Sequence, residues 1–62
     1  MDNQELRKLK EELGINDFKI GYKTGVHYGV VQDFFSGKSD ELSDRDRAMI
    51  EALLKKEAKQ AK

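Results

Sequence analysis

The chain has 62 residues, with twelve basic and twelve acidic side chains, no cysteine and one histidine, and this length predicts a single small domain over residues 1–62. The absence of cysteine excludes disulfides and thiolate metal sites, and a lone histidine excludes a multi-histidine cluster, so no metal or other cofactor is expected. No apolar run approaches the roughly 18 residues of a membrane span, and the N-terminus lacks the apolar stretch of a signal peptide, so we expect a cytoplasmic protein without membrane contact.

The first predicted helix covers residues 3–13 and carries one narrow apolar stripe. The stripe consists of leucines at spacings of three and four: Leu6, Leu9 and Leu13. We expect the charged residues between them to face water: Arg7, Lys8, Lys10, Glu11 and Glu12. Gly14 follows the last leucine and is a typical residue to end a helix.

A second, short helix is predicted over residues 17–24. Asn16 is a suitable N-cap, and Gly25 is placed to end the helix. Phe18 and Ile20 are expected to supply its apolar contacts. A helix of barely two turns is not stable alone, so it must pack against neighbours on both sides.

A third helix is predicted over residues 27–36, although its valines and aromatic residues also suit a strand. The apolar residues recur in pairs at helical spacing rather than in alternation: Val30, Val31, Phe34 and Phe35. The sequence leaves the position of three large apolar residues open: Tyr22, Val30 and Phe35. They either complete the core or are exposed and form a surface for a dimer or another partner.

The fourth predicted helix covers residues 43–59, with Ser43 as its N-cap and Asp46 three residues later. Its core face follows helical spacing: Met49, Ile50, Leu53 and Leu54. Residues 55–62 have few apolar anchors and are expected to form a solvated helix end, with a phosphate-binding arm as the alternative. The predicted fold class is therefore all-α, with four helices of which the middle two are short.

The two short helices meet at Gly25 in a way that is typical of a helix-turn-helix. A glycine at this point takes left-handed backbone angles without a Cβ clash, so the chain can enter the next helix at a steep angle. Close packing of the two helices needs a small residue on the first, and Gly21 stands four residues before the turn. Apolar side chains must fill the corner from both sides: Ile20, Val26, Val31 and Phe34.

Residues 6–38, LRKLKEELGINDFKIGYKTGVHYGVVQDFFSGK, resemble the lambda-repressor and Cro-like helix-turn-helix proteins of phages and bacterial regulators. The similar features are a first helix of this length, a capped short second helix, a TGV-type turn and a recognition helix ending in GK. Residues 42–56, LSDRDRAMIEALLKK, are similar to the helix that follows the recognition helix in lac-repressor-type headpieces. The resemblance implies a four-helix, lambda-repressor-like domain that places residues 27–36 in the major groove of double-stranded DNA.

The resemblance also implies roles for individual residues. Those facing the bases would be His27, Tyr28, Gly29, Gln32, Asp33 and Ser36. Gln32 would form paired hydrogen bonds with adenine, and Asp33 would accept a hydrogen bond from a cytosine amino group. Tyr28 would contact a phosphate or the methyl group of a thymine. Phosphate contacts would come from three lysines and from backbone N–H groups near two helix starts: Lys19, Lys23, Lys38, Asn16 and Ser43.

Two functions are consistent with these patterns. The first is a sequence-specific DNA-binding transcriptional regulator acting as a dimer on a two-fold site, favoured by the polar face of residues 27–36 and its flanking lysines. The second is a helix-turn-helix fold used as a protein-binding module, such as an antirepressor or a regulator subunit, favoured by the zero net charge. Asp17 would repel the DNA backbone unless its side chain is engaged in capping the helix, and His27 has the alternative of being a plain surface or helix-start residue. The sequence contains no nucleophile–base pair, catalytic carboxylate pair or phosphate-cradling glycine loop, so we do not expect an enzyme.

Overall fold

The computed structural model describes residues 2–60 and contains four α-helices and no strand within that range. The helices are α1 (Asn3–Leu13), α2 (Asp17–Thr24), α3 (Tyr28–Ser36) and α4 (Asp44–Gln60). Each begins and ends within one residue of its predicted range, and the all-α class with four helices is confirmed. The expected C-terminal tail is helical as far as Gln60, and its last two residues lie outside the described range.

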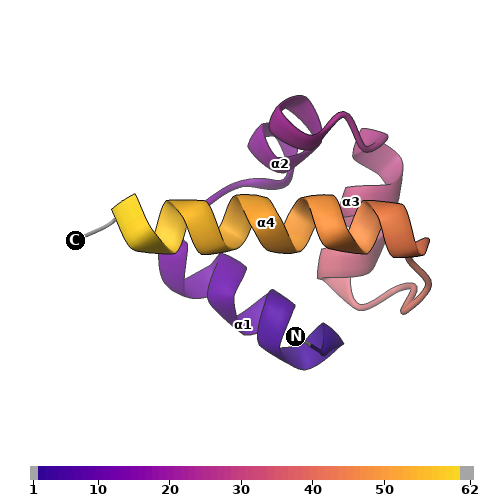
Figure 1. The fold of residues 1–62 in the computed structure, drawn as a ribbon. Coiled ribbons are helices and arrows are strands. Elements are labelled where there is room, and N and C mark those ends of the chain that lie inside the picture. The colour runs from indigo at the N-terminus through magenta and orange to yellow at the C-terminus, as the bar shows by residue number, and fades with distance from the viewer. Residues whose placement is uncertain (1, 61–62) are drawn as a thin grey trace.

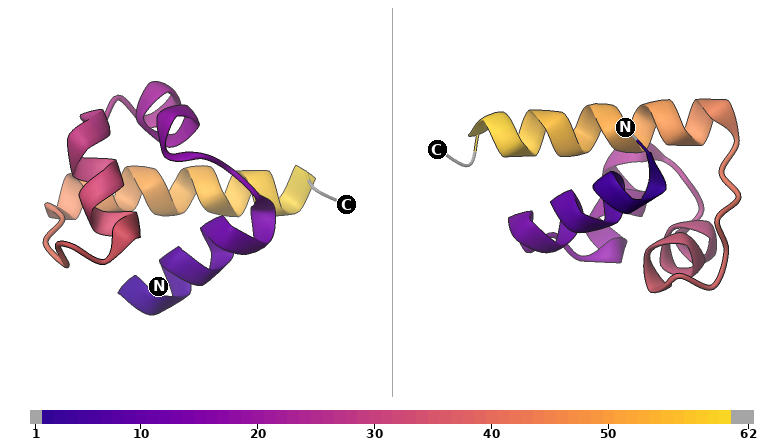
Figure 2. Two further views of the ribbon diagram at one scale, coloured as in Figure 1. Left: turned by 180° about the vertical axis from the view of Figure 1, so that it is seen from behind. Right: turned by 90° about the horizontal axis from the view of Figure 1, so that it is seen from below.

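The other helices all lie on one side of α4, which is the longest (Figures 1 and 2). Both α1 and α2 pack against α4, and α2 also packs against α3. In every view α3 lies at the end of the molecule where α4 begins (Figures 1 and 2). The short helices thus have the neighbours that they need, because helices of eight and nine residues are unstable in water on their own.

Two helix starts carry the side-chain caps that the sequence predicts. The Asn16 side-chain oxygen accepts a hydrogen bond from the Lys19 N–H at 2.7 Å at the start of α2. The Ser43 hydroxyl accepts one from the Asp46 N–H at 3.1 Å at the start of α4. Each cap satisfies an N–H group that has no partner within the helix, so these local residues determine where the helices begin.

One buried cluster joins the four helices. Its fully buried side chains come from every helix: Leu6, Ile20, Val31, Phe34, Ile50 and Leu54. Burial of a side chain of this size contributes about 1.5–3 kcal/mol to folding. Phe35, for which core and surface positions were both open, is half-buried against this cluster.

Several large apolar residues are more exposed than their spacing suggests. Phe18, expected to supply apolar contacts to α2, lies outside the core, because its side chain is 68% exposed. Met49, expected on the core face of α4, is also exposed, and Tyr22 and Val30 lie on the surface. The reason on α2 is that Ile20 occupies its core side. Residues two positions before and after it then point away, since each helical residue turns by about 100°.

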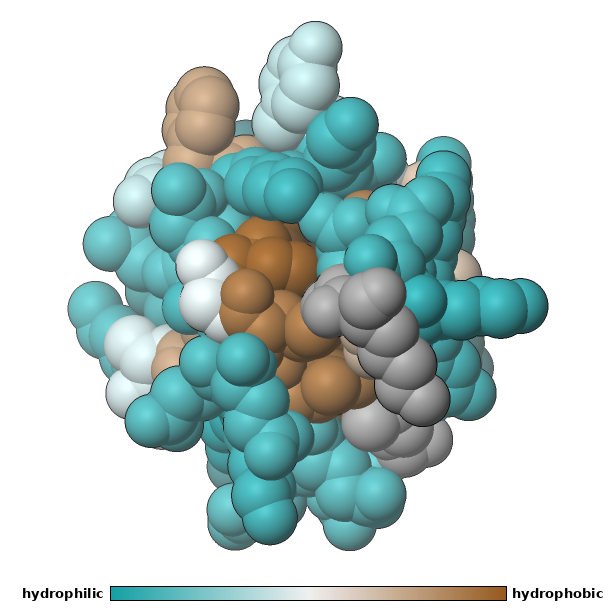
Figure 3. Space-filling view, turned by 90° about the vertical axis from the view of Figure 1, so that its left-hand side faces the viewer, coloured by the Kyte–Doolittle hydropathy of each residue, from teal (hydrophilic) through white to brown (hydrophobic). Residues whose placement is uncertain are grey.

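Apolar surface is visible on the side of the molecule where α4 ends, with hydrophilic side chains around it (Figure 3). Leu13 and Ile15 line a small pocket there, together with Lys19, Glu57 and Gln60. This pocket is formed by the end of α1, the start of α2 and the end of α4, so it lies away from α3.

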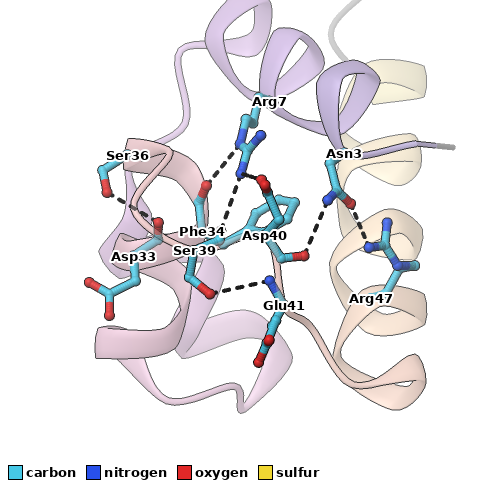
Figure 4. A network of polar contacts seen from close by, with 9 residues as sticks. All are labelled: Asn3, Arg7, Asp33, Phe34, Ser36, Ser39, Asp40, Glu41 and Arg47. Atoms are coloured by element: carbon cyan, nitrogen blue, oxygen red, sulfur yellow. Dashed lines mark hydrogen bonds and ion pairs between the residues drawn. The ribbon is translucent and has the colours of Figure 1, made fainter.

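Arg7 connects α1 to the end of α3 and does not simply face water as predicted (Figure 4). Its guanidinium donates hydrogen bonds to the Phe34 carbonyl at 2.9 Å and to the Ser39 carbonyl at 3.2 Å. It also forms an ion pair with Asp40 at 2.7 Å and lies 4.6 Å from the centre of the Phe34 ring. One side chain therefore holds both the last turn of α3 and the segment that follows it.

Asn3 extends this polar network from α1 to α4 (Figure 4). Its side-chain N–H donates to the Asp40 carbonyl at 3.2 Å, and its side-chain oxygen accepts a hydrogen bond from Arg47. The segment between α3 and α4 is thus held by polar contacts to α1 as well as by the core.

Candidate nucleic-acid interface

The turn between α2 and α3 has the backbone geometry that Gly25 predicts. Gly25 is left-handed, with φ of 80°, and its N–H donates to the Gly21 carbonyl at 2.9 Å. Thr24 is buried beside it, where its hydroxyl donates to the Ile20 carbonyl at 2.6 Å and accepts from the Val26 N–H at 3.2 Å. These hydrogen bonds pair the Gly25 and Val26 N–H groups, so backbone groups at the turn are satisfied where the helix ends.

Gly21 is the point of closest approach between α2 and the chain that enters α3. A Cβ atom built on Gly21 would lie 3.1 Å from the Val26 carbonyl oxygen and 3.6 Å from the Tyr28 Cα. A side chain at this position would be too close to the Val26 carbonyl, which would have to shift to make room for it. Gly21 and Gly25 together therefore set the angle between α2 and α3.

The predicted corner residues divide α3 into a buried face and an outward face. Val31 and Phe34 are fully buried, and Val26 in the turn is 6% exposed. We define the outer face of α3 as the opposite side of the helix: Tyr28, Gly29, Gln32, Asp33 and Ser36. Gln32 and Ser36 are exposed, and Tyr28 is 45% exposed.

His27 precedes α3 as its N-cap and is not its first residue, which corrects the predicted range of 27–36. Its ring Nδ1 accepts a hydrogen bond from the Gly29 N–H at 3.0 Å. A Cβ atom on Gly29 would lie 3.2 Å from that nitrogen, so the absence of a side chain at Gly29 makes room for the cap. The exposed histidine ring therefore has a structural role at the start of α3.

The far end of the outer face is engaged in capping α3. The Asp33 carbonyl accepts hydrogen bonds from the Lys38 and Ser39 N–H groups at 3.0 and 3.1 Å. The Ser36 hydroxyl donates to the same carbonyl at 3.1 Å (Figure 4). The Asp33 carboxylate is separate from these contacts and belongs to a half-buried residue.

The three lysines predicted to hold phosphate do not share one environment. Lys19 pairs its ammonium with the Glu57 carboxylate at 2.6 Å, so it turns toward α4 and does not stand free beside α3. Lys23, Lys56 and Glu57 line a small pocket between α2 and α4. Lys38 is exposed and follows directly after the cap of α3. Of the three, Lys38 alone adjoins the end of α3 in the chain.

The Lys19–Glu57 pair gives a testable titration. The pKa of Glu57 is lowered, mainly by the hydrogen bond from Lys19. Burial acts in the opposite direction and raises this pKa, while the positive charges of Lys19, Lys23 and Lys56 lower it further. Because the folded-state pKa is depressed, the pair stabilises the fold above the unfolded-state pKa of Glu57. This stabilisation is lost as pH falls through the folded-state pKa. We expect Lys19→Met to raise the pKa of Glu57 toward its ordinary value, and Lys23→Met to raise it less. An NMR titration of the Glu57 carboxyl measures both; an unchanged pKa in Lys19→Met would show that the pair does not form in solution.

The charge of Asp17 at the start of α2 is balanced by an ion pair and not by capping, since Asn16 is the cap of this helix. Its carboxylate lies 2.9 Å from the Lys10 ammonium, and both side chains are only 22% exposed. Lys10, predicted to face water, also lies 5.4 Å from the centre of the Phe35 ring. The repulsion that Asp17 would exert on a phosphate is therefore reduced by a neighbouring positive charge.

Phe18 and Tyr22 are surface residues that sequence reasoning did not assign to the site. The Phe18 ring makes an edge-to-face contact with the Tyr28 ring, with centroids 6.2 Å apart. Tyr22, one turn later on α2, is 78% exposed. The predicted core position of Ile20 was the signal that could have found both, because it places residues 18 and 22 on the outer side of α2.

Comparisons with protein-family models, with curated proteins and with solved structures gave no match to this chain. Among residues 2–60, no helix combines the length and the apolar character that crossing a membrane requires. The function must therefore be inferred from the geometry of α2, the turn and α3.

Proposed function

We propose that the chain is a sequence-specific, double-stranded DNA-binding transcriptional regulator that acts in the cytoplasm. In this proposal α2, the Gly25 turn and α3 form a helix-turn-helix, and α3 inserts its outer face into the major groove. That groove is wide enough for an α-helix and presents a distinct pattern of donors and acceptors at each base pair. Two copies of the chain would bind the two halves of a two-fold site.

The observation that carries the proposal is the division of α3 into two unlike faces. Val31 and Phe34 anchor one face in the core, while Tyr28 and Gln32 are exposed on the other. Base contacts need side chains held in a narrow range of positions. Two features help α3 to meet this requirement: the close approach of Gly21 to the backbone at the start of α3, and the Arg7 hydrogen bond to the carbonyl of Phe34 near its end.

Gln32 is the residue to which we assign base discrimination. A carboxamide donates and accepts at the same time, which matches the N6 and N7 atoms of adenine. Phosphate contacts would come from Lys38 and from backbone N–H groups at the starts of α2 and α4, where the helix dipole favours an anion. Lys23 can add to these contacts, whereas Lys19 would first have to leave Glu57.

A second candidate function is a protein-binding module built on the same fold. The observation in its favour is that α2 exposes Phe18 and Tyr22 on a chain whose formal net charge is zero. A protein partner would cover both aromatic rings. Its association would lack the steep salt dependence of DNA binding, since no condensed counterions would be released.

Salt dependence separates the two functions. We expect the chain to enrich specific duplexes from a random DNA library, and the affinity for an enriched duplex to fall as salt rises from about 50 to 200 mM. About three to five phosphate contacts per chain predict a slope of about −3 to −5 for log K against log salt, doubled for a dimer. Fluorescence anisotropy measures this slope. Absence of any duplex binding at about 50 mM salt, the low end of that range, would overturn the proposal in favour of the protein-binding module.

A further inference from the structure

Phe18 and Tyr28 form an exposed aromatic pair that joins the starts of two helices. Phe18 is the second residue of α2 and Tyr28 is the first residue of α3. Their rings meet edge to face, with an interplanar angle of 62° and centroids 6.2 Å apart. Phe18 is nevertheless 68% exposed and Tyr28 45% exposed, so the domain leaves most of Phe18 and nearly half of Tyr28 uncovered.

Because Tyr28 belongs to α3, the position of α3 on DNA also determines where the Phe18–Tyr28 pair lies. In the proposed function, α3 inserts its outer face into the groove, and the N-terminal residues of a recognition helix contact base edges. Tyr28 is the first residue of that face, and the ring contact keeps Phe18 beside it. The acidic neighbour of Phe18 repels phosphate less than a free carboxylate would, because the Asp17 carboxylate is paired with Lys10 at 2.9 Å. Phe18 is therefore placed at the edge of the same groove as the outer face of α3.

The chemistry of a phenyl ring restricts what Phe18 can contact there. The ring offers no hydrogen-bond donor or acceptor, so the polar groups on base edges give it no partner. The apolar substituent on the major-groove edge of the bases is the C5-methyl group of thymine, and phenylalanine is among the side chains suited to contact it. We infer that Phe18, braced by Tyr28, is a specificity-determining residue that contacts a thymine methyl in each half-site. This inference rests on the proposed function.

Removing the methyl group alone tests the contact. Each thymine of a duplex enriched by the full chain is replaced in turn by deoxyuridine, which lacks the C5-methyl but keeps every hydrogen-bonding group. Burial of one methyl group contributes about 0.8 kcal/mol, so at the contacted thymine we expect affinity to fall about fourfold, at tenfold per 1.4 kcal/mol. The Phe18→Ala variant should bind the thymine and deoxyuridine duplexes equally at that position.

Tyr22→Ala is the matched control, because it removes an exposed aromatic ring one turn further along α2. This variant should keep the fourfold preference for thymine. The inference is overturned if every deoxyuridine replacement leaves wild-type affinity unchanged, or if the preference survives in Phe18→Ala. Either result would leave the proposed function standing, since the duplex is still bound. Failure to enrich any duplex would instead overturn the proposed function, and the inference with it.

Discussion

Phe34→Ala should destabilise the domain by about 3–5 kcal/mol, the usual cost of truncating a buried aromatic residue. Phe34 is fully buried, packs edge to face against Phe35 and lies under the Arg7 guanidinium. A domain of this size seldom has more than about 3–5 kcal/mol of stability in total. The variant should therefore be largely unfolded at room temperature, as measured by circular dichroism with urea titration, and should lose DNA binding for that reason alone.

Phe18→Ala is the control for this prediction, because it removes the same side chain from a position that is 68% exposed. Surface substitutions usually change stability by no more than about 0.5 kcal/mol, so this variant should unfold close to the wild-type midpoint. Equal losses in the two variants would mean that the assignment of core and surface on α2 and α3 is wrong.

Arg7→Ala should cost about 2–3 kcal/mol, a large effect for a charged residue outside the apolar core. The side chain donates to the Phe34 and Ser39 carbonyls and pairs with Asp40, and hydrogen bonds to charged groups contribute about 1.5–3 kcal/mol. Its removal takes these hydrogen bonds away from the Phe34 and Ser39 carbonyls, so the segment after α3 keeps the Asn3–Asp40 hydrogen bond to α1 but loses the contacts from Arg7. Thermal and urea unfolding measure the loss.

Two further variants show whether the guanidinium itself is responsible. Lys8→Ala removes an exposed charge from the next position of α1 and should have little effect on stability. Arg7→Lys keeps the charge but cannot reproduce the planar fork of donors, so it should recover only part of the loss. If Arg7→Ala is as mild as Lys8→Ala, the network drawn in Figure 4 does not stabilise the end of α3.

The corner between α2 and α3 could be predicted from sequence because its requirements are local. A left-handed residue at Gly25, a missing side chain at Gly21 and apolar side chains such as Val31 are imposed by the backbone over a short stretch of chain. The caps at Asn16 and Ser43 were predictable for the same reason, since each involves a side chain and an N–H group three residues apart.

The contacts that the sequence did not reveal join residues far apart in the chain. Arg7 donates to carbonyl groups 27 and 32 residues away. Every residue has a backbone carbonyl, so the sequence does not indicate which of them will accept this hydrogen bond. Lys19 meets Glu57 only because α2 packs against α4. In a chain with twelve acids and twelve bases, many such pairs are possible, and tertiary packing decides which of them form.

The central claim is that the outer face of α3 reads bases, and Gln32→Ala tests it most directly. Gln32 is exposed, so the variant should fold normally. It should lose about 1–3 kcal/mol of affinity for the enriched duplex and its preference at one base pair, because a bidentate contact is lost. Gln4→Ala, an exposed glutamine on α1, is the matched control and should leave affinity unchanged. Anisotropy titrations against the enriched duplex and single-base-pair variants give both quantities. Wild-type affinity and base preference in Gln32→Ala would contradict the claim.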